Sequence, residues 1–474
     1  MDLDTAKKLI ADKVSGHSDF CLRAETAFRY YSVKNDILTS KNKDPCEGDV
    51  ENPLRNADNR IAFSFHNLLV NQKASYLFTA PPLFDVKDQA LNALITDTLG
   101  DAYAKKCKDL CVDASNAGIG WVHYWQDEEG FQWAVVPPSQ VIPIYTKRLD
   151  KKLLAVVRYY TEIDDDGRSW DVYEYWNDKQ CQAFRRENNQ DTTIAHDLQL
   201  CPMFAEFAGA GQSKADNEYN HNFGTVPFIP FGNNNLLSSD LDNVKSLIDA
   251  YDKTYSGFVN DLEDIQEIIF VLTNYGGIRE EGNKGIVEFL RNLKKYKTIP
   301  LDSAGTGDTT GLSTLTIEIP TEARDKLLDI TRKAIFDMGQ GIDPQQQGFD
   351  NTSGEAMKFL YSLLELKAGL METEFRLGFG ELVRAICKYH GKKIRSIIQT
   401  WTRTAIRNDA ELVDMCAKSK GIISDKTIIK NHPLVDDPEE EEKQLEKERQ
   451  DSDIYEGSLT EQDDNGEEGG EGDV

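Results

Sequence analysis

The chain has 474 residues, of which 39% are hydrophobic and 28% are charged, and its formal net charge is −27. This composition is typical of a folded, water-soluble body with room for about two to four domains. The acidic balance argues against a protein that grips nucleic acid by its phosphates, and no apolar run approaches the roughly 20 residues that span a bilayer.

The charge is concentrated at the carboxyl end. Residues 436–474 contain 18 acidic and three basic residues, which leaves a net charge of only −12 on the body before them. This segment is also rich in glycine and poor in apolar residues, so we predict an acidic disordered tail with a short helix near residues 440–450. The amino end, Met1-Asp2-Leu3-Asp4, has no basic start or apolar core and predicts no signal peptide, so we expect the protein to stay in the cytosol where it is made.

Eight cysteines are scattered along the chain without a Cys-x-x-Cys pair. Their spacing favours reduced thiols in or near the core over a disulfide framework or a zinc site.

The first part of the chain has helical spacing. Apolar residues recur every three or four positions over residues 1–45, 59–78 and 89–116, which predicts helices there. Pro81 and Pro82 end the second of them.

The next part, residues 121–231, has short aromatic and β-branched runs. The runs are separated by residues 127–130, Pro137-Pro138 and residues 164–167, which predicts strands joined by hairpin turns. The two acidic clusters that end in glycine lack the ligand spacing of a calcium loop.

A long helix is then predicted over residues 238–272, where apolar residues keep helical spacing without interruption. Residues 273–320 differ in composition, since they contain several glycines and a basic stretch, and we predict a small α/β insertion there. The basic residues are Arg291, Lys294, Lys295 and Lys297. They could contact phosphate or an acidic partner, or form a solvated helix face.

Residues 322–386 are predicted to form a helix, an irregular loop and a second helix. The first helix carries one apolar face, formed by Ala323, Leu327, Ile330, Ala334 and Met338. Glycines and Pro344 then interrupt the pattern, and helix resumes at Ser353-Gly354-Glu355 with an apolar stripe that includes Leu363, Leu364, Leu370 and Phe375. The loop between them is long and polar, so we expect it to be exposed.

This arrangement resembles tailed-bacteriophage portal proteins, the head-to-tail connectors. The resemblance is carried by residues 331–343 (TRKAIFDMGQGID), the glutamine-rich connection, and residues 349–368 (FDNTSGEAMKFLYSLLELKA). A second match lies at residues 59–86, where a helix has an Asn near its start and Tyr76-Leu77 followed by proline.

The resemblance implies an α+β portal fold with a mixed wing domain, long stem helices, a small α/β clip and a helical crown. The implied order is wing 1–237, first stem helix 238–272, clip 273–320, second stem helix 321–338, tunnel loop 339–353, kinked wing helix 354–391, crown 392–435 and acidic tail 436–474. Gly369, Gly378 and Gly380 are predicted to bend the wing helix.

The resemblance further implies a ring, usually of twelve subunits, at the portal vertex of the capsid in the virion. Viral double-stranded DNA is packaged through such a ring by terminase and later ejected. Other implied partners are the major capsid or scaffolding protein and a head-completion adaptor; no membrane and no cofactor are implied. The predicted channel-lining residues of the tunnel loop are Gln345, Gln346, Gln347, Phe349, Asp350 and Asn351.

No catalytic signature is present in the sequence. The seven histidines form no His-Glu-x-x-His, and neither Gly209–Lys214 nor Gly277–Asn283 matches a phosphate loop. A non-enzymatic role is therefore expected. Two other hypotheses remain: a metal-dependent DNA-processing enzyme of the packaging machinery, which magnesium-dependent nuclease activity would reveal, and a structural adaptor that forms no ring.

Overall fold

The computed structural model describes residues 1–39, 57–128, 130–203, 217–265, 269–273, 311–315, 320–345, 354–403, 409–432, 434–435, 438 and 440–448. The chain divides into two compact units. One contains residues 1–345 and 361–403, and the other contains residues 346–360 and 404–474. The helix α9 (Gly354–Tyr389) runs from the second unit into the first.

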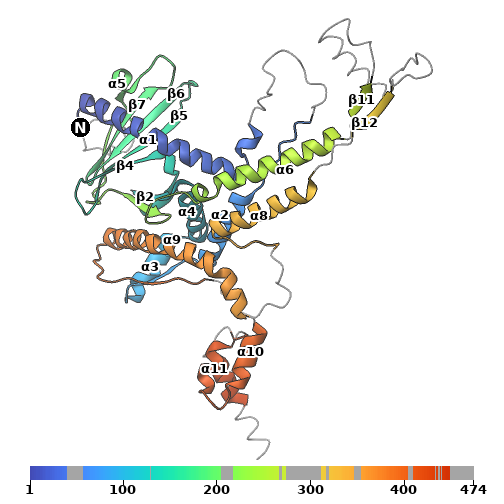
Figure 1. Cartoon of the computed structure of the whole chain (residues 1–474). Coiled ribbons are helices and arrows are strands. Elements are labelled where there is room, and N and C mark those ends of the chain that lie inside the picture. The colour runs from blue at the N-terminus through green and yellow to red at the C-terminus, as the bar shows by residue number, and fades with distance from the viewer. Residues whose placement is uncertain are drawn as a thin grey trace, which may run out of the picture. The chain divides into compact units, whose positions relative to one another are not determined.

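A six-stranded antiparallel sheet lies near the amino end of the chain (Figure 1). Its order is β4 (Val141–Tyr145), β5 (Leu153–Ile163), β6 (Ser169–Trp176), β7 (Gln180–Glu187) and β8 (Gln199–Leu200), with β9 (Glu218–Asn220) also pairing with β7. The helix α1 (Leu3–Tyr31) packs on this sheet, because Ala6 and Ile10 share a buried cluster with Ile142 and Val157. The short helix η2 (Pro138–Gln140) directly precedes β4, and the short helix α5 (Ile194–Asp197) lies between β7 and β8.

A three-stranded antiparallel sheet, ordered β10 (Phe228–Gly232), β2 (Ile119–Asp127) and β3 (Gly130–Val136), forms the centre of the first unit. It packs with α2 (Phe65–Leu77), α3 (Gln89–Leu99), α4 (Tyr103–Ala117) and α9 around the largest buried cluster. Two of the three predicted hairpin turns are confirmed, since Asp127 pairs with Gly130 between β2 and β3, and Ile163 pairs with Ser169 between β5 and β6. The third is wrong, because Pro137-Pro138 leads through a short helix from β3 to a strand of the other sheet.

Two helices, α6 (Lys245–Ile265) and α8 (Thr321–Gly339), lie side by side and extend from this core (Figure 1). The short helix η3 (Asp240–Asn243) precedes α6 and begins with a capping box formed by Ser239 and Asp242. Arg324 on α8 bonds to Asp261 on α6 and lies over the ring of Phe258. Tyr251, Ile335 and Phe336 are buried in the cluster that joins the two helices to α1 and α2.

The prediction of one long helix over residues 238–272 is wrong at both ends. The helix α6 starts at Lys245 after η3, and β11 (Ile269–Thr273) pairs with β12 (Gly311–Leu315). Ile268 and Leu272 are four residues apart, which fits a helix, but the run Ile269–Thr273 is equally rich in residues that favour strands. The rest of the predicted clip lies outside the described residues.

Two other predicted helices are broken or shortened. Residues 89–116 form two helices, because Gly100 ends α3 with a φ of 73°. Helix α1 ends at Tyr31, and only η1 (Asp36–Leu38) follows it within residues 32–39.

Residues 59–63 are not helical, although the predicted helix includes them. They are extended along α6, which replaces the missing helical hydrogen bonds: the Ile61 N–H donates to Ser256 Oγ at 3.0 Å, and the Phe63 N–H donates to Asp252 Oδ1 at 3.0 Å. The helix α2 therefore starts only at Phe65.

Helical spacing over residues 392–401 also predicts a helix, and this prediction is wrong. The strand β13 (Ile398–Thr400) pairs there with β1 (Leu83–Asp85). The partner strand lies about 300 residues away in the chain, so local spacing alone gives no sign of the pairing.

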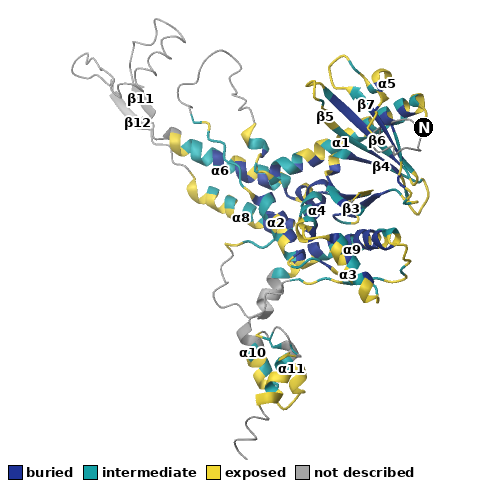
Figure 2. Cartoon of the chain, turned by 180° about the vertical axis from the view of Figure 1, so that it is seen from behind, coloured by how far each residue is buried: buried dark blue, intermediate teal, exposed yellow. Residues whose placement is uncertain are grey.

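The apolar face predicted on residues 321–338 is largely exposed in the single chain. Helix α8 packs on α6 and α2 through a second face that contains Ile335, Phe336 and Gly339, whereas Leu327, Ile330 and Met338 are exposed. Figure 2 shows exposed residues along α8. On α9, Leu364 and Phe375 are buried as core residues, but Leu363 and Leu370 are exposed.

The helix α9 is unbroken across the three glycines at which bends are predicted. Gly378 has a packing reason to be glycine, because a Cβ there would lie 2.6 Å from the ring of Phe231.

The second unit contains α10 (Asp409–Lys418), α11 (Asp425–Asn431) and a helical segment at residues 440–448. Lys426 pairs with Glu442 at 2.9 Å and ties this segment to α11. Helical spacing near residues 424–432 also predicts a short helix; this helix and the one predicted near residues 440–450 are confirmed, while residues 449–474 lie outside the described residues. Five described cysteines are free and buried: Cys107, Cys111, Cys181, Cys201 and Cys387.

Candidate functional site

The chain leaves α8 through residues 339–345, which we call the loop root because they lead into the predicted loop. Gln340 adopts a left-handed conformation with a φ of 53°. The Gln340 N–H donates to the Asp337 carbonyl, and the Gly341 N–H donates to the Phe336 carbonyl at 3.0 Å. These bonds form a Schellman motif, which ends the helix with its last carbonyls satisfied.

Side chains from two helices hold the loop root after this turn. Gln72 on α2 bonds twice to the backbone of Ile342: its Nε2 donates to the carbonyl at 2.7 Å, and its Oε1 accepts from the N–H at 3.0 Å. Arg332 on α8 makes a forked ion pair with Asp343, in which Nη2 and Oδ1 are 2.7 Å apart. Asp343 Oδ1 also accepts from the Gln345 N–H at 3.0 Å. The path of the chain is therefore defined up to residue 345.

Gly341 lets the loop root lie directly against α2. A Cβ at this position would be 2.2 Å from Leu69 Cδ2 and 2.9 Å from Gln72 Oε1. Leu69 is buried and cannot move aside freely. The close approach is what brings Ile342 within reach of Gln72.

Gly341→Ala should therefore lower the stability of the protein by about 1–3 kcal/mol, because the added methyl group overpacks the contact with Leu69. The decrease can be measured as a lower midpoint of thermal unfolding. Gly369→Ala is a matched control on α9, since nothing lies within 4 Å of its added Cβ. It should stabilise the helix by roughly 0.5–1 kcal/mol. Equal midpoints for the two variants would contradict the packing argument.

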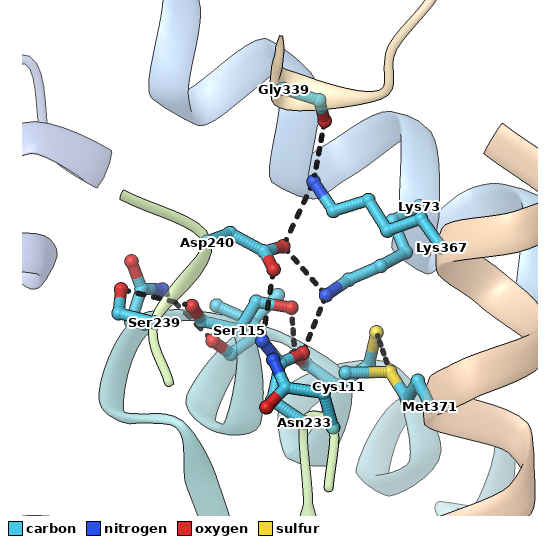
Figure 3. A network of polar contacts seen from close by, with 12 residues as sticks. Lys73, Cys111, Ser115, Asn233, Ser239, Asp240, Gly339, Lys367 and Met371 are labelled. Carbon is cyan, nitrogen blue, oxygen red and sulfur yellow. Dashed lines mark hydrogen bonds and ion pairs between the residues drawn. The ribbon is translucent and has the colours of Figure 1, made fainter. Parts of the chain in front are cut away.

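A buried ionic cluster lies beside the loop root (Figure 3). Asp240, at the start of η3, lies between two lysines: its Oδ2 is 2.6 Å from Lys73 Nζ of α2 and 3.1 Å from Lys367 Nζ of α9. Lys367 also donates to the Gly339 carbonyl at 2.9 Å. The three side chains are almost fully buried. One carboxylate thus joins the first residues before α6, the end of α8, and the helices α2 and α9.

Polar neighbours complete the cluster. Asn233, which directly follows β10, accepts from Lys73 Nζ at 2.7 Å and donates to Asp240 Oδ1 at 2.9 Å. Ser239 donates to the Ser115 carbonyl of α4 at 3.3 Å. Because buried charges are costly unless they are paired and hydrogen-bonded, these contacts allow the cluster to be tolerated inside the protein.

Burial and the charges of the cluster shift the pKa values of Asp240, Lys367 and the neighbouring His66. Burial opposes ionisation of Asp240, but the Lys367 and Lys73 ammoniums outweigh it and hold the pKa of its carboxyl well below the ordinary value. Burial lowers the pKa of Lys367, although Asp240 opposes the shift. Burial also lowers the pKa of His66 on α2 to about 4, against the hydrogen bond between its Nε2 and Asn116 Oδ1 at 2.8 Å.

Comparison with known proteins decides what kind of protein carries this site. The family model of phage portal proteins, SPP1 Gp6-like, matches residues 10–455. The chain belongs to this portal protein family. The predicted family, the α+β fold class and the portal function are thereby confirmed, and the family is a structural one found in phage particles.

Two portal proteins match this chain over most of their own length. The portal protein of Clostridium phage phiCD119 is 41% identical over 463 residues, which are 94% of this chain and 95% of the relative. The portal protein of Bacillus phage SPP1 is 29% identical and covers 94% of this chain and 86% of its own length.

Solved structures of the necks of gene transfer agent particles are also similar. The neck of the native particle, with C12 symmetry, matches with a TM-score of 0.42 and 11% identity over 78% of this chain and 89% of the other. The neck of the empty particle, with C6 symmetry, matches with a TM-score of 0.43, 11% identity, and 77% and 88% coverage.

Two features are absent from the described part of this portal chain. None of its helices is both long and apolar enough to cross a membrane. No group of three or more His, Cys, Asp or Glu side chains in the same residues could hold a metal ion.

Most of the residues predicted to line the portal channel lie outside the described residues. Gln345 is described and exposed, and its N–H bonds to Asp343. The others, Gln346, Gln347, Phe349, Asp350 and Asn351, are not described, and neither are the predicted basic residues Arg291, Lys294, Lys295 and Lys297. Their roles stay predictions.

The residues that hold the loop root of this portal protein were not predicted from the sequence. Lys73 and Lys367 each occupy an inward position of an apolar helix face, beside Leu69 and Leu77 on α2 and beside Leu364 and Met371 on α9. A charged residue in such a row is a signal of a buried partner. Its spacing does not identify the partner, because Asp240 is far from both lysines in the chain.

Proposed function

We propose that twelve copies of this chain form the portal ring at one vertex of the capsid. Viral double-stranded DNA enters the capsid through the ring during packaging and leaves through it during ejection. The observation that carries this proposal is the family match over residues 10–455, together with portal relatives that are matched along most of their length. In this proposal the chain is not an enzyme, and it assembles in the host cytoplasm before it becomes part of the virion.

The loop at residues 339–353 faces the DNA channel in this proposal. Its support is the loop root, where Gln72, Arg332 and Lys367 hold the chain between α8 and the loop. A loop that touches moving DNA needs a fixed base, because force on its tip must not unwind the helix that carries it. Repeated around a ring, the polar side chains Gln345, Gln346, Gln347, Asp350 and Asn351 make weak contacts with the DNA backbone, and Phe349 lies among them.

The charge of the chain suits passage of DNA rather than tight binding. The body before residue 436 has a net charge of −12. Each phosphate that a protein neutralises releases counterions and adds affinity, and strong affinity would slow movement. An acidic channel with few cations allows DNA to slide.

The proposed partners follow the family. Residues 273–320 form the clip, which meets terminase during packaging and then the head-completion adaptor. The basic residues of this segment contact acidic or phosphate groups there. The wing contacts the major capsid or scaffolding protein, and the crown at residues 392–435 lies inside the capsid.

Deletion of Gln345–Phe349 tests the role of the loop. We expect the ring to assemble normally, because the loop root up to Pro344 and the core are retained, while packaging or genome retention fails. Ring assembly is measured by negative-stain imaging and native mass spectrometry, and packaging by the amount of nuclease-protected DNA. Normal packaging by the deleted protein would contradict a channel-facing loop.

Images of the purified wild-type protein separate the portal from the other two hypotheses. Rings with a central hole support the portal. Monomers or rods would indicate an adaptor, and magnesium-dependent cleavage of DNA would indicate a processing enzyme.

A further inference from the structure

Helix α8 carries a row of large apolar side chains that face away from the core. Leu327, Ile330 and Met338 are between 49% and 58% exposed, and they follow helical spacing together with Ala323 and Ala334. The buried residues Ile335 and Phe336 lie on a different face of the same helix. A helix with two apolar faces is typical of one that is covered on both sides.

Helix α9 carries a second row of the same kind. Leu363, Leu366, Leu370 and Leu377 are between 37% and 65% exposed. Their spacings of three, four and seven residues place them on one face of the helix, opposite the side on which Leu364, Phe375 and other core residues are buried.

The two rows are close to each other at the loop root. Lys367 on α9 bonds to the Gly339 carbonyl at the end of α8, and these residues are sequence neighbours of Leu366 and Met338. Together the rows expose on the order of 600 Å² of accessible surface, the upper end of what a monomeric protein leaves as an apolar patch. Stable interfaces bury about 800 Å² on each partner, so the rows would supply most of one interface.

We propose that a second copy of this chain covers these two rows, so that α8 and α9 form part of the contact between neighbouring subunits. The inference rests on the proposed ring. Composition favours a permanent partner of this kind: permanent interfaces are more apolar than the rest of the surface, whereas those of partners that dock and leave are about as polar as the surface. DNA is a poor occupant, because it is bound mainly through charged and polar contacts to its phosphates.

In a closed ring each subunit uses two different surfaces, one for each neighbour. The α8 and α9 rows are one of these surfaces. A charge placed in the middle of a row would be buried without a partner in every contact of the ring, while in a free subunit it would remain in water. Such a substitution should therefore weaken assembly of the ring without impairing the folding of the subunit.

Ile330→Glu tests this separation in the full-length protein. We expect at least a tenfold rise in the protein concentration needed for ring formation, measured by native mass spectrometry and light scattering, with an unchanged circular dichroism spectrum and thermal midpoint of the subunit. Leu22→Glu on α1 is the control, since Leu22 is 62% exposed but lies outside both rows. It should form rings at the wild-type concentration.

A second substitution, Leu370→Glu, tests the α9 row independently, and Ile330→Ser serves if the glutamate variant does not fold. Rings that form at the wild-type concentration from folded Ile330→Glu and Leu370→Glu proteins would overturn the proposal. The same outcome with loss of binding to another phage protein would assign the rows to that partner instead. Absence of rings from the wild-type protein would contradict the proposed function itself.

Discussion

Replacing Asp240 by alanine should destabilise the region around the loop root by about 3–5 kcal/mol, because two buried ammoniums would lose their shared carboxylate. Asp240 Oδ2 lies 2.6 Å from Lys73 Nζ and 3.1 Å from Lys367 Nζ. Asn233 would also lose an acceptor. Since the cluster joins the starts or ends of several helices, the expected result is local opening of their junction.

The buried thiol of Cys111 gives a local measure of this opening. Cys111 lies on α4 and is fully buried, with its Sγ 3.3 Å from Met371 Sδ of α9. A thiol reagent can reach it only when the packing opens, so its labelling rate reports the free energy of opening. A loss of 3–5 kcal/mol predicts at least about a hundredfold faster labelling, followed by mass spectrometry of the peptide.

Two further variants define the cause. Asp325→Ala removes an exposed carboxylate on α8 and should change the opening free energy by less than about 0.5 kcal/mol. The triple variant Asp240→Leu, Lys73→Met and Lys367→Met removes all three charges and should restore at least half of the lost free energy. A labelling rate for Asp240→Ala within about threefold of wild type would refute the ionic explanation.

The elements with strong local patterns were predicted well from the sequence. The loop between α8 and α9 was expected from Gly339, Gly341 and Pro344, and α8 ends at Gly339 with Gln340 as its cap. Local chemistry is sufficient there, because a left-handed cap and a proline stop a helix wherever it lies.

The face that each helix buries was harder to predict. The spacing of apolar residues identifies the apolar faces of α8, but the helix has two such faces. Within a single chain only the face with Ile335 and Phe336 is buried. Which face meets the core depends on α6 and α2, which are distant in the sequence. The strand β13 was missed for the same reason, since its partner β1 lies at residues 83–85.

Prediction of the candidate site at the loop root from the sequence had the same limit. The polar loop was visible in the sequence, but its supports on other elements, Gln72, Lys73, Asp240 and Lys367, come together only through tertiary contacts. Hydrogen bonds between distant residues have no periodic signal. The signal that was missed in the sequence is the pair of lysines on apolar helix faces, since a charged residue there requires a buried partner.

His66 should make this junction sensitive to acid. Burial lowers its pKa to about 4, whereas an unfolded histidine titrates near 6.5. Between these two values the open chain binds a proton that the folded chain does not, so the stability from neutral His66 is complete above about pH 6.5 and is lost as the pH falls toward 4. From pH 7.5 to pH 5.0 we expect a loss of about 2 kcal/mol.

His66→Gln isolates this contribution, because glutamine can still donate to Asn116 but does not titrate. Two buried acids make the stability change with pH in the opposite direction. Burial raises the pKa of Asp113 to about 7 and that of Asp252 to about 6. Both acids are present in the wild type and in the variant, so their effects cancel when the two proteins are compared at the same pH.

The comparison is made on the labelling rate of Cys111 with a pyridyl disulfide, which reacts at low pH. The ratio of the wild-type rate to the His66→Gln rate should rise about thirtyfold between pH 7.5 and pH 5.0. The fixed charges around the imidazole act on this shift: Asp240 favours protonation, and Lys73 and Lys367 oppose it. Adding Lys367→Met to both proteins should therefore reduce the rise, and a ratio that does not change with pH would show that His66 does not remain neutral in the folded chain.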